Sequence, residues 1–441
     1  MTATVTLRDE AVALLRDLIR LDTVNPPGNE TAAAELLRAY LEANGVACEL
    51  YARVAERANL VARLPGRGEG PRLLLLSHTD TVLADPAEWQ VDPWAGDVRD
   101  GWVWGRGALD MKGQVAASAV AIASLARDGF EPAGDVIFAA CADEEVGEDP
   151  QYGLPWLCEH HPQAVEAEYA INEGAGDRVQ LPDGRVVYLC STAEKRSSPL
   201  KVIVRGRSGH GSKPGIADNA LVKAAALIER LGAYAPEPVL GPEVEEFLRV
   251  LLGEVPAARD AVARAREVSG FAAETVEPLL SLTVAPTMIE ASKKRNVIPG
   301  RCELTVDTRL LPGQTEAEAE EIIRGVLGPG DYQLEWGKAY GGTRSALDPV
   351  LWDAVSEFVA ELEPGAQVAP ICVAGFTDSH WVRERFGTVA YGFFPMRTLS
   401  PQLADRLIHS ADERIPLDDL ELGARFLRHV AEAVGGGVGS G

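Results

Sequence analysis

The sequence predicts an α/β protein in which helices flank a mixed β-sheet and a smaller α/β domain is inserted into the larger one. Two observations support this prediction. Short β-rich runs alternate with helical runs along most of the chain, which is typical of a sheet covered by helices. The chain has 441 residues, which is too long for one ordinary core and about right for two domains.

The first part of the chain shows this alternation clearly. A run rich in alanine, valine, isoleucine and leucine at 113–127 predicts a helix, and apolar β-rich runs lie on both sides of it. These runs predict strands at 59–64, 72–77, 135–142 and 168–172. The resulting βαβ order predicts a sheet with helices on both faces.

A different order begins near residue 195. Strands are predicted at 200–205, 282–289, 303–309 and 332–336, and helices at 218–231 and 315–326. Asp218 or Asn219 opens the first of these helices. Thr315 and Glu318 have the spacing of an N-cap residue and its capping-box partner, so they open the second. The order β-α-β-β-α-β is a unit that can fold as its own domain.

These two patterns predict the domain boundaries. Residues 196–340 form the inserted domain, which a mostly helical insertion at 241–277 interrupts. Residues 1–195 and 341–441 form the larger domain, because the α/β rhythm resumes after the inserted unit. The resumed elements are a helix at 349–362, strands near 368–373 and 388–393, and a last helix at 417–434.

Composition excludes several classes of partner. The net charge of −24 repels phosphate backbones, so we expect no nucleic-acid partner. The longest apolar runs are far below the ~20 residues of a membrane span, so we expect no membrane partner. The six cysteines include no C-x-x-C pair and most lie in apolar runs, which indicates reduced core residues of a cytoplasmic protein.

A histidine and an aspartate follow the predicted strand at 72–77. Residues two apart on a strand point the same way, so His78 and Asp80 can share one site, with Asp80 accepting the second imidazole N–H. This arrangement is common around metal-binding histidines. Taken alone, the pair is more simply explained by a histidine that caps a strand.

Carboxylates recur at the ends of other predicted elements. Asp110 lies between glycines just before a helix, where it serves either as an N-cap or as a bridge between two metals. Glu144 and Glu145 belong to three consecutive acids that repel one another, and bound cations would relieve this repulsion. One of the two glutamates can bind metal while the other moves protons. A solvated acidic turn is the alternative. Glu173 also follows a strand, where ligands of open α/β sheets collect.

Two histidines lie in loops where packing explains them poorly. His210 lies between glycines in the inserted domain, and His409 lies in a polar loop before the last helix. Either is equally well explained as a plain loop residue. Together with the carboxylates, however, histidine ligands suit zinc, cobalt or manganese. Two such ions can hold and acidify one bridging water.

The segments that carry these residues resemble the co-catalytic zinc family of aminoacylases, carboxypeptidase G, acetylornithine deacetylase and succinyl-diaminopimelate desuccinylase. The resemblance spans nearly the whole chain, and the segments occur in the family's order. They are S-H-T-D-T-V, G-R-G-A-L-D-M-K-G, D-E-E-V-G, N-E-G, S-G-H-G-S-K-P, N-V-I-P and the late H-S-A-D-E. Jointly they are highly specific.

The resemblance implies two divalent ions per chain, zinc in the first place, with cobalt or manganese as alternatives. Asp110 bridges both ions. His78 and Glu173 complete one ion, and Glu145 and His409 complete the other.

The resemblance also implies how these ligands are used. Glu144 is the general base and acid, and Asp80 orients His78. A cis peptide joins Asp110 to Met111.

Residues of the inserted domain acquire substrate roles from the same resemblance. His210 is a lid histidine that reaches the substrate oxyanion, often in the partner subunit of a dimer. Asn296 and Arg309 bind the substrate carboxylate, and Gly375 lines the pocket. Phe376 stands where the family commonly has glycine, so it puts specificity in doubt rather than chemistry.

The implied protein is a homodimeric hydrolase whose inserted domain is a lid and dimerisation domain. It cleaves the amide or peptide bond of small peptides or N-acyl amino acids that carry a free carboxylate. An aminopeptidase, a non-peptide amidase of the same family and a non-catalytic metal-binding relative are the alternatives. Glu144 argues against the last, because a metal store needs no spare carboxylate beside Glu145.

Overall fold

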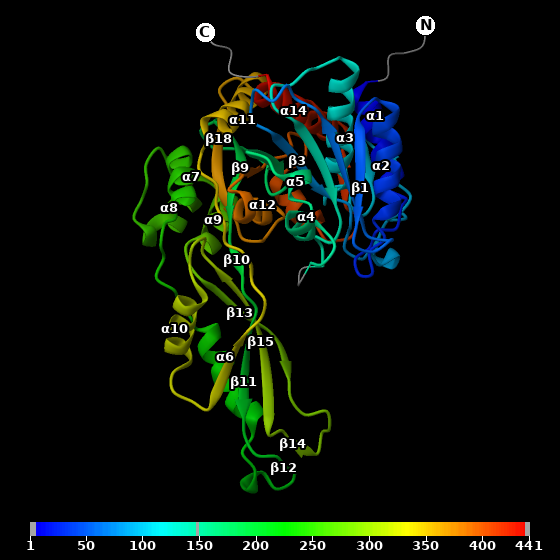
Figure 1. The fold of residues 1–441 in the computed structure, drawn as a ribbon. Coiled ribbons are helices and arrows are strands. Elements are labelled where there is room, and N and C mark those ends of the chain that lie inside the picture. Colours follow the sequence, from blue (N-terminus) through cyan, green and yellow to red (C-terminus); the bar gives the residue numbers. More distant parts are fainter. Residues whose placement is uncertain (1–5, 147–149, 437–441) are drawn as a thin grey trace. The chain divides into compact units, whose positions relative to one another are not determined.

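The computed structural model describes residues 6–146 and 150–436, so Gly147 of the predicted acidic segment lies outside the described residues (Figure 1). The chain divides into two compact units. Unit 1 contains Met1–Thr192, Ser345–Ile371 and Thr377–Gly441, and unit 2 contains Ala193–Arg344 and Cys372–Phe376. The predicted α/β class is confirmed. Within the described ranges, no helix combines the length and apolar character that crossing a membrane requires.

Unit 1 is built on a mixed sheet. Its strands are, in spatial order, β1 (Ala47–Ala52), β2 (Ala58–Leu64), β6 (Val136–Cys141), β3 (Leu73–His78), β7 (Tyr169–Asn172), β19 (Val389–Gly392), β9 (Val186–Glu194) and β18 (Gln367–Val373), and β8 (Arg178–Gln180) pairs with β9. The four strands β6, β3, β7 and β19 run parallel. β1 and β2 add an antiparallel edge.

Helices cover both faces of this sheet (Figure 1). The central strand β3 is buried along its whole length, which is why its sequence is an unbroken apolar run rather than an alternating one. One face packs against α1 (Leu7–Ile19), α2 (Thr31–Ala43), α3 (Lys112–Arg127), α11 (Pro349–Leu362) and α14 (Leu417–Gly435). The other face packs against α4 (Leu154–His160), α5 (Pro162–Val165) and α12 (Ser379–Phe386).

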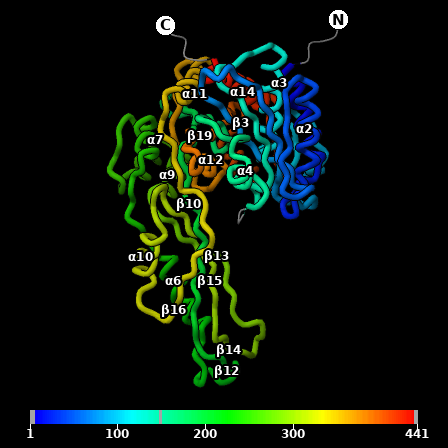
Figure 2. The backbone as a smooth tube through the Cα atoms, viewed as in Figure 1, coloured from blue at the N-terminus to red at the C-terminus, as the bar shows by residue number. Residues whose placement is uncertain are grey.

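Segments from the two ends of the chain meet in unit 1. The tube in Figure 2 shows α14, near the C-terminus, lying against α3. A small sheet joins β20 (Arg414–Pro416) to β5 (Trp102–Trp104), which pairs with β4 (Asp97–Arg99). The helix α13 (Pro401–Leu407) precedes β20. This small sheet therefore brings the loop after β5 next to the loop before β20.

Unit 2 has the predicted β-α-β-β-α-β order. Its elements are β11 (Leu200–Arg205), α6 (Ala220–Gly232), β13 (Thr283–Glu290), β15 (Arg301–Leu310), α10 (Glu316–Leu327) and β16 (Tyr332–Trp336). Short strands β10 (Arg196–Ser197) and β17 (Tyr340–Gly341) extend the sheet, and β12 (Gly209–His210) pairs with β14 (Val297–Ile298). The predicted helical insertion consists of α7 (Pro242–Leu252), α8 (Ala261–Val268) and α9 (Gly270–Val276).

Local signals in the sequence were reliable where side chains cap helices. Thr315 and Glu318 form the predicted capping box at the start of α10. Of the two candidates for α6, Asn219 is the N-cap, and its side chain accepts from the backbone N–H of Leu221. Strand β9 was not predicted, although all of its residues are buried; its polar end hides the strand pattern.

Candidate metal site

Three neighbouring parallel strands end at one edge of the unit 1 sheet. In β3 and β6, His78 pairs with Cys141, and in β3 and β7, Leu75 pairs with Ile171. Chains leaving parallel strands emerge on the same side, where ligands of α/β sheets bind. Asp80, the acidic segment after β6 and Glu173 after β7 therefore leave the sheet at the same edge.

Asp110 lies between two histidines. Its Oδ1 is 3.2 Å from His78 Nε2, and its Oδ2 is 3.0 Å from His409 Nε2. Glu173 Oε2 is 3.6 Å from the same His78 nitrogen, and Glu145 Oε2 is 3.2 Å from the same His409 nitrogen. Each histidine is thus accompanied by one glutamate and by one oxygen of Asp110. This is the arrangement of two adjacent binding positions that share a carboxylate.

The structure excludes one of the two interpretations of Asp110. Helix α3 begins after Met111, and no side chain caps its N-terminus. The N-cap interpretation of Asp110 is therefore wrong. The peptide bond between Asp110 and Met111 is cis, as predicted.

The electrostatics of the cluster fit a cation. Burial raises the pKa of Glu144 well above its usual value, and burial together with the charge of Asp110 raises the pKa of Glu145 to about 7. Burial would also raise the pKa of Asp110, but hydrogen bonds from His409 and His78 outweigh it and hold this pKa below its usual value. Oε1 of Glu145 is buried and has no hydrogen-bond partner among the described residues.

Such a cluster is costly without a positive charge, because buried carboxylates need either partners or neutralisation. His78, Glu144 and Glu173 place ligand atoms close enough for one ion, and so do His78, Asp110 and Glu145. Imidazole and carboxylate donors suit zinc, cobalt and manganese. The residues present therefore fit a divalent metal site.

Asp80 holds the site in more ways than the sequence indicated. His78 Nδ1 lies 3.1 Å from the backbone carbonyl oxygen of Asp80 and 3.5 Å from its carboxylate Oδ1. The carboxylate instead accepts the backbone N–H groups of Glu144 (3.2 Å) and Glu145 (3.0 Å). Asp80 thus orients the histidine mainly through its main chain and fixes the acidic segment through its side chain.

A second buried network supports the same segment. Asp143 has a positive φ of 69°, and its carboxylate accepts from Arg57 Nη2 (2.8 Å) and Asn25 Nδ2 (3.1 Å). Arg57 also pairs with Glu30, and Asn25 also donates to Asp80 (2.9 Å). These supporting residues were not predicted. No local motif marks them, because Arg57 lies 27 residues from Glu30 and 86 from Asp143.

The predicted substrate residues lie in unit 2. His210 is exposed on β12, and its Nδ1 lies 2.8 Å from Ser212 Oγ. Asn296 is exposed in the turn before β14, and its carbonyl oxygen accepts from the Gly211 N–H at 2.8 Å, so it neighbours His210. Arg309 lies on β15 and makes a two-pronged ion pair with Asp307 (2.8 and 3.1 Å). Gly375 lies in the segment Cys372–Phe376 of this unit.

Unit 2 does not bring Asn296 next to Arg309. The turn that holds Asn296 precedes the first residue of β15, Arg301, and Arg309 is near the other end of that strand. The eight residue steps from Arg301 to Arg309 span about 26 Å at roughly 3.3 Å per residue. Within one chain, therefore, Asn296 and Arg309 do not form a pair.

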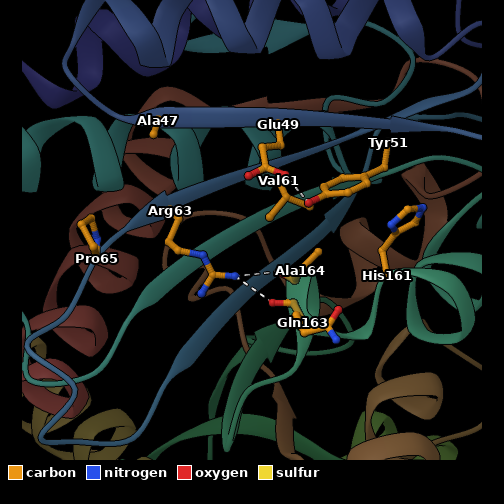
Figure 3. A pocket seen from close by; sticks show the side chains of 9 residues that line it. All are labelled: Ala47, Glu49, Tyr51, Val61, Arg63, Pro65, His161, Gln163 and Ala164. Carbon is orange, nitrogen blue, oxygen red and sulfur yellow. Dashed lines mark hydrogen bonds between the residues drawn. The ribbon is translucent and has the colours of Figure 1, made fainter.

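Unit 1 also has a surface pocket away from the candidate ligands (Figure 3). Its volume is about 390 Å³. Arg63, which lines it, points toward Gln163 and Ala164 and donates to their carbonyl oxygens at 3.0 and 3.3 Å; it also pairs with Asp135. Glu49 accepts from Tyr51. The charged side chains of Arg63 and Glu49 are thus already paired. The lining residues are Ala47, Glu49, Tyr51, Val61, Arg63, Pro65, His161, Gln163 and Ala164.

Fold and site together define an α/β metalloenzyme. Residues 74–433 match Peptidase family M20/M25/M40, and the chain belongs to this family. It is therefore a metal-dependent peptidase or amidohydrolase, as the sequence predicted.

Individual relatives agree with this assignment. The chain is 27% identical over 430 residues to a succinyl-diaminopimelate desuccinylase of Cereibacter sphaeroides, covering 95% of this chain and 97% of that one. It is 28% identical over 377 residues to the N-fatty-acyl-amino acid synthase/hydrolase PM20D1 of Xenopus tropicalis, covering 80% and 70%. Its fold is similar to that of the M20 family metallo-carboxypeptidase Sso-CP2 from Sulfolobus solfataricus, with a TM-score of 0.74 at 19% identity over 97% and 99% of the chains.

The paired geometry around Asp110 predicts two divalent ions per chain. Elemental analysis of protein loaded with zinc and freed of excess metal should approach two ions. His409→Ala should lower the value towards one, whereas His160→Ala, at an exposed helix residue, should leave it unchanged. A maximum of one ion in the unaltered protein would contradict the two-position site.

Proposed function

We propose that this protein hydrolyses the amide or peptide bond of N-acyl amino acids or small peptides that carry a free carboxylate. The observation that supports this most directly is Asp110, which offers one oxygen to each of two histidine-glutamate pairs. Glu144 has a ligand atom close to His78 and Glu173, and we assign it to proton transfer rather than to metal binding. A protein that only stored metal would not need this additional acid.

The names of two relatives support the substrate class. A desuccinylase and an N-fatty-acyl-amino acid hydrolase both act where an acyl group is joined to the nitrogen of an amino acid. The acyl groups in these names differ, so we infer the amino-acid part as the common element. Zinc is the proposed metal, with cobalt or manganese as alternatives.

Each residue of the site then has a proposed part in the reaction. Two divalent ions, when bound, acidify a shared water and polarise the scissile carbonyl. Glu144 takes the proton of the attacking water and passes it to the leaving nitrogen. Its buried surroundings raise its pKa, which suits a group that must both accept and donate a proton. The carboxylate of Asp80 keeps Glu144 in place by accepting the backbone N–H of Glu144.

We assign the catalytic role to unit 1 and the role of substrate lid and dimerisation domain to unit 2. Arg309 is the proposed partner of the substrate carboxylate, since a guanidinium binds a carboxylate with two parallel hydrogen bonds. Asp307 already occupies it, so a substrate must replace or share that pair. His210 is proposed to meet the substrate oxyanion, Asn296 to contact the substrate carboxylate, and Gly375 to line the pocket.

The separation of His210 and Asn296 from Arg309 along β15 supports a dimer. In this dimer His210 and Asn296 serve the site of one copy, and Arg309 serves the site of the other. Apolar side chains on unit 2 support it as well. Val222 on α6 is 66% exposed, and Met288 on β13 is 60% exposed. In the described part of the chain, β13 pairs with β15 on one side only, so it is a free edge. The unpaired state of all six cysteines supports a cytoplasmic location.

A hydrolysis screen tests the proposed function. N-acyl amino acids and dipeptides should be cleaved in the presence of zinc, cobalt or manganese. Peptides with a free amino terminus should not be cleaved in preference to the same peptides with an acylated amino terminus. Glu144→Gln should keep both ions and lower kcat about 10²–10⁴-fold, because an amide cannot transfer the proton. Glu159→Gln, at an exposed acid, is the control. Normal turnover by the Glu144 variant would show that another group is the base.

Replacement of Arg309 tests the carboxylate pocket. Arg309→Ala should raise KM roughly 10–100-fold for substrates with a free carboxylate, because a hydrogen bond to a charged group contributes about 1.5–3 kcal/mol. The matching amides should change little. Arg301→Ala is a matched control, since Arg301 lies on the same strand and pairs with Glu303 two residues away (2.7 Å). Equal effects on acids and amides would remove Arg309 from the pocket.

Charge placed on α6 and on the free edge strand β13 tests the dimer. Val222→Glu combined with Met288→Glu should convert a dimer to a monomer, because the interface would then bury unpaired charges. Light scattering at micromolar concentration gives the mass. Leu83→Glu, at a side chain that is 70% exposed on unit 1, should leave the mass unchanged. A monomeric unaltered protein, or a double variant that remains dimeric, would refute this interface.

A further inference from the structure

The buried pair Arg106–Glu413 joins the two loops that carry Asp110 and His409. The pairing of β5 with β20 continues beyond the strands, because the N–H of Gly105 donates to the carbonyl oxygen of Glu413 at 2.9 Å. Arg106 and Glu413 are 3% and 0% exposed. They lie 307 residues apart in the sequence. Arg106 is four residues before Asp110, and Glu413 is four residues after His409.

Both oxygens of the Glu413 carboxylate accept hydrogen bonds from donors of one loop, residues 106–110. Oε2 accepts from Arg106 Nη1 (2.6 Å) and from the N–H of Gly107 (3.0 Å). Oε1 accepts from the N–H groups of Leu109 (2.7 Å) and Asp110 (3.0 Å). One carboxylate from the His409 loop therefore holds the main chain of the bridging aspartate itself.

Arg106 completes the link in the opposite direction. Its Nη2 donates to the carbonyl oxygen of Ser410 at 3.0 Å, directly after His409. His409 has a positive φ of 58°, a conformation that residues other than glycine avoid, and its side chain is 52% exposed. A half-exposed imidazole has little packing to hold this backbone conformation, and the hydrogen bond from Arg106 to Ser410 fixes the main chain next to it.

We propose that Arg106 and Glu413 are positioning residues that set the separation of Asp110 and His409, and that they thereby control the affinity of one of the two metal ions. This inference rests on the proposed two-ion site. The ion bound by Asp110, Glu145 and His409 depends on the pair. The ion bound by His78, Glu173 and the other oxygen of Asp110 has two of its three ligands at the ends of β3 and β7, so it depends on the pair only through Asp110. Loss of the Arg106–Glu413 pair should therefore lower the affinity for one ion more than the affinity for the other.

Glu413→Gln tests the proposal. In either orientation the amide NH₂ of glutamine faces two donors, so two of the four hydrogen bonds that hold the Asp110 loop are lost. Competition between the metal-free protein and a zinc chelator should give two dissociation constants. We expect the weaker binding to lose about 10–100-fold in affinity, as is typical when the partners of metal ligands are removed. The tighter binding should change less than about threefold.

Kinetics separate positioning from general damage. At limiting zinc the variant should lose activity, and added zinc should restore kcat, because Glu144 is unaltered. KM should stay near its original value. Loss of kcat that excess zinc does not restore would contradict a role that acts only through metal affinity.

Asp419→Asn is the matched control. Asp419 is also fully buried, and each of its oxygens accepts two backbone N–H groups, from Arg397, Thr398 and Leu399 (2.8–3.1 Å). The loop it holds carries none of the proposed ligands. Thermal stability should fall in both variants, but zinc affinity should fall only in Glu413→Gln. Equal losses of affinity in the two would overturn the proposal.

Arg106→Lys decides the question if Glu413→Gln does not fold. Lysine keeps the charge next to Glu413 but cannot reach both Glu413 and the Ser410 carbonyl with a fixed fork. Arg106→Lys should lower the affinity for the same ion, by a smaller factor than Glu413→Gln does. Unchanged affinity for both ions in the folded variant would refute the role of the pair. If the unaltered protein binds fewer than two ions, the two-ion site is refuted and this proposal with it, whereas the hydrolysis screen tests the proposed function separately.

Discussion

The site depends on the parallel register of three neighbouring strands, β6, β3 and β7. Their carboxyl ends lie at one edge of the sheet, so residues that are far apart in the sequence, such as Asp80 and Glu173, meet there. A slip of one residue would turn His78 towards the opposite face. Burial of β3 on both faces holds the register, and apolar packing thereby controls the placement of polar ligands.

The two halves of the site are supported differently. His78 ends a central strand, so the sheet positions it directly. His409 and Asp110 lie on loops, and their positions follow from buried carboxylates that accept main-chain N–H groups. Asp80 does this for the acidic segment, and Glu413 does it for the loop of Asp110. Loops without secondary structure of their own thus acquire the rigidity that metal ligands need.

The buried acids of the site repel one another. Burial raises the pKa values of Glu144, Glu145 and Glu173, so in the absence of cations the acids oppose one another. A bound cation relieves this opposition, which couples folding of the site to metal binding.

The sequence alone determined the α/β class, the order of elements in unit 2, the capping box at Thr315 and, by resemblance, the cis peptide at Asp110. These follow from local spacing or from motifs that the chain carries intact. Only the tertiary structure decided that Asp110 is not a helix cap, that Asp80 uses its main chain to hold His78, and that Asn296 is remote from Arg309. It also revealed Arg57 and Glu413. Hydrogen bonds between residues separated by tens to hundreds of positions leave no periodic trace in a single sequence, because their partners are chosen by how sheets and loops pack.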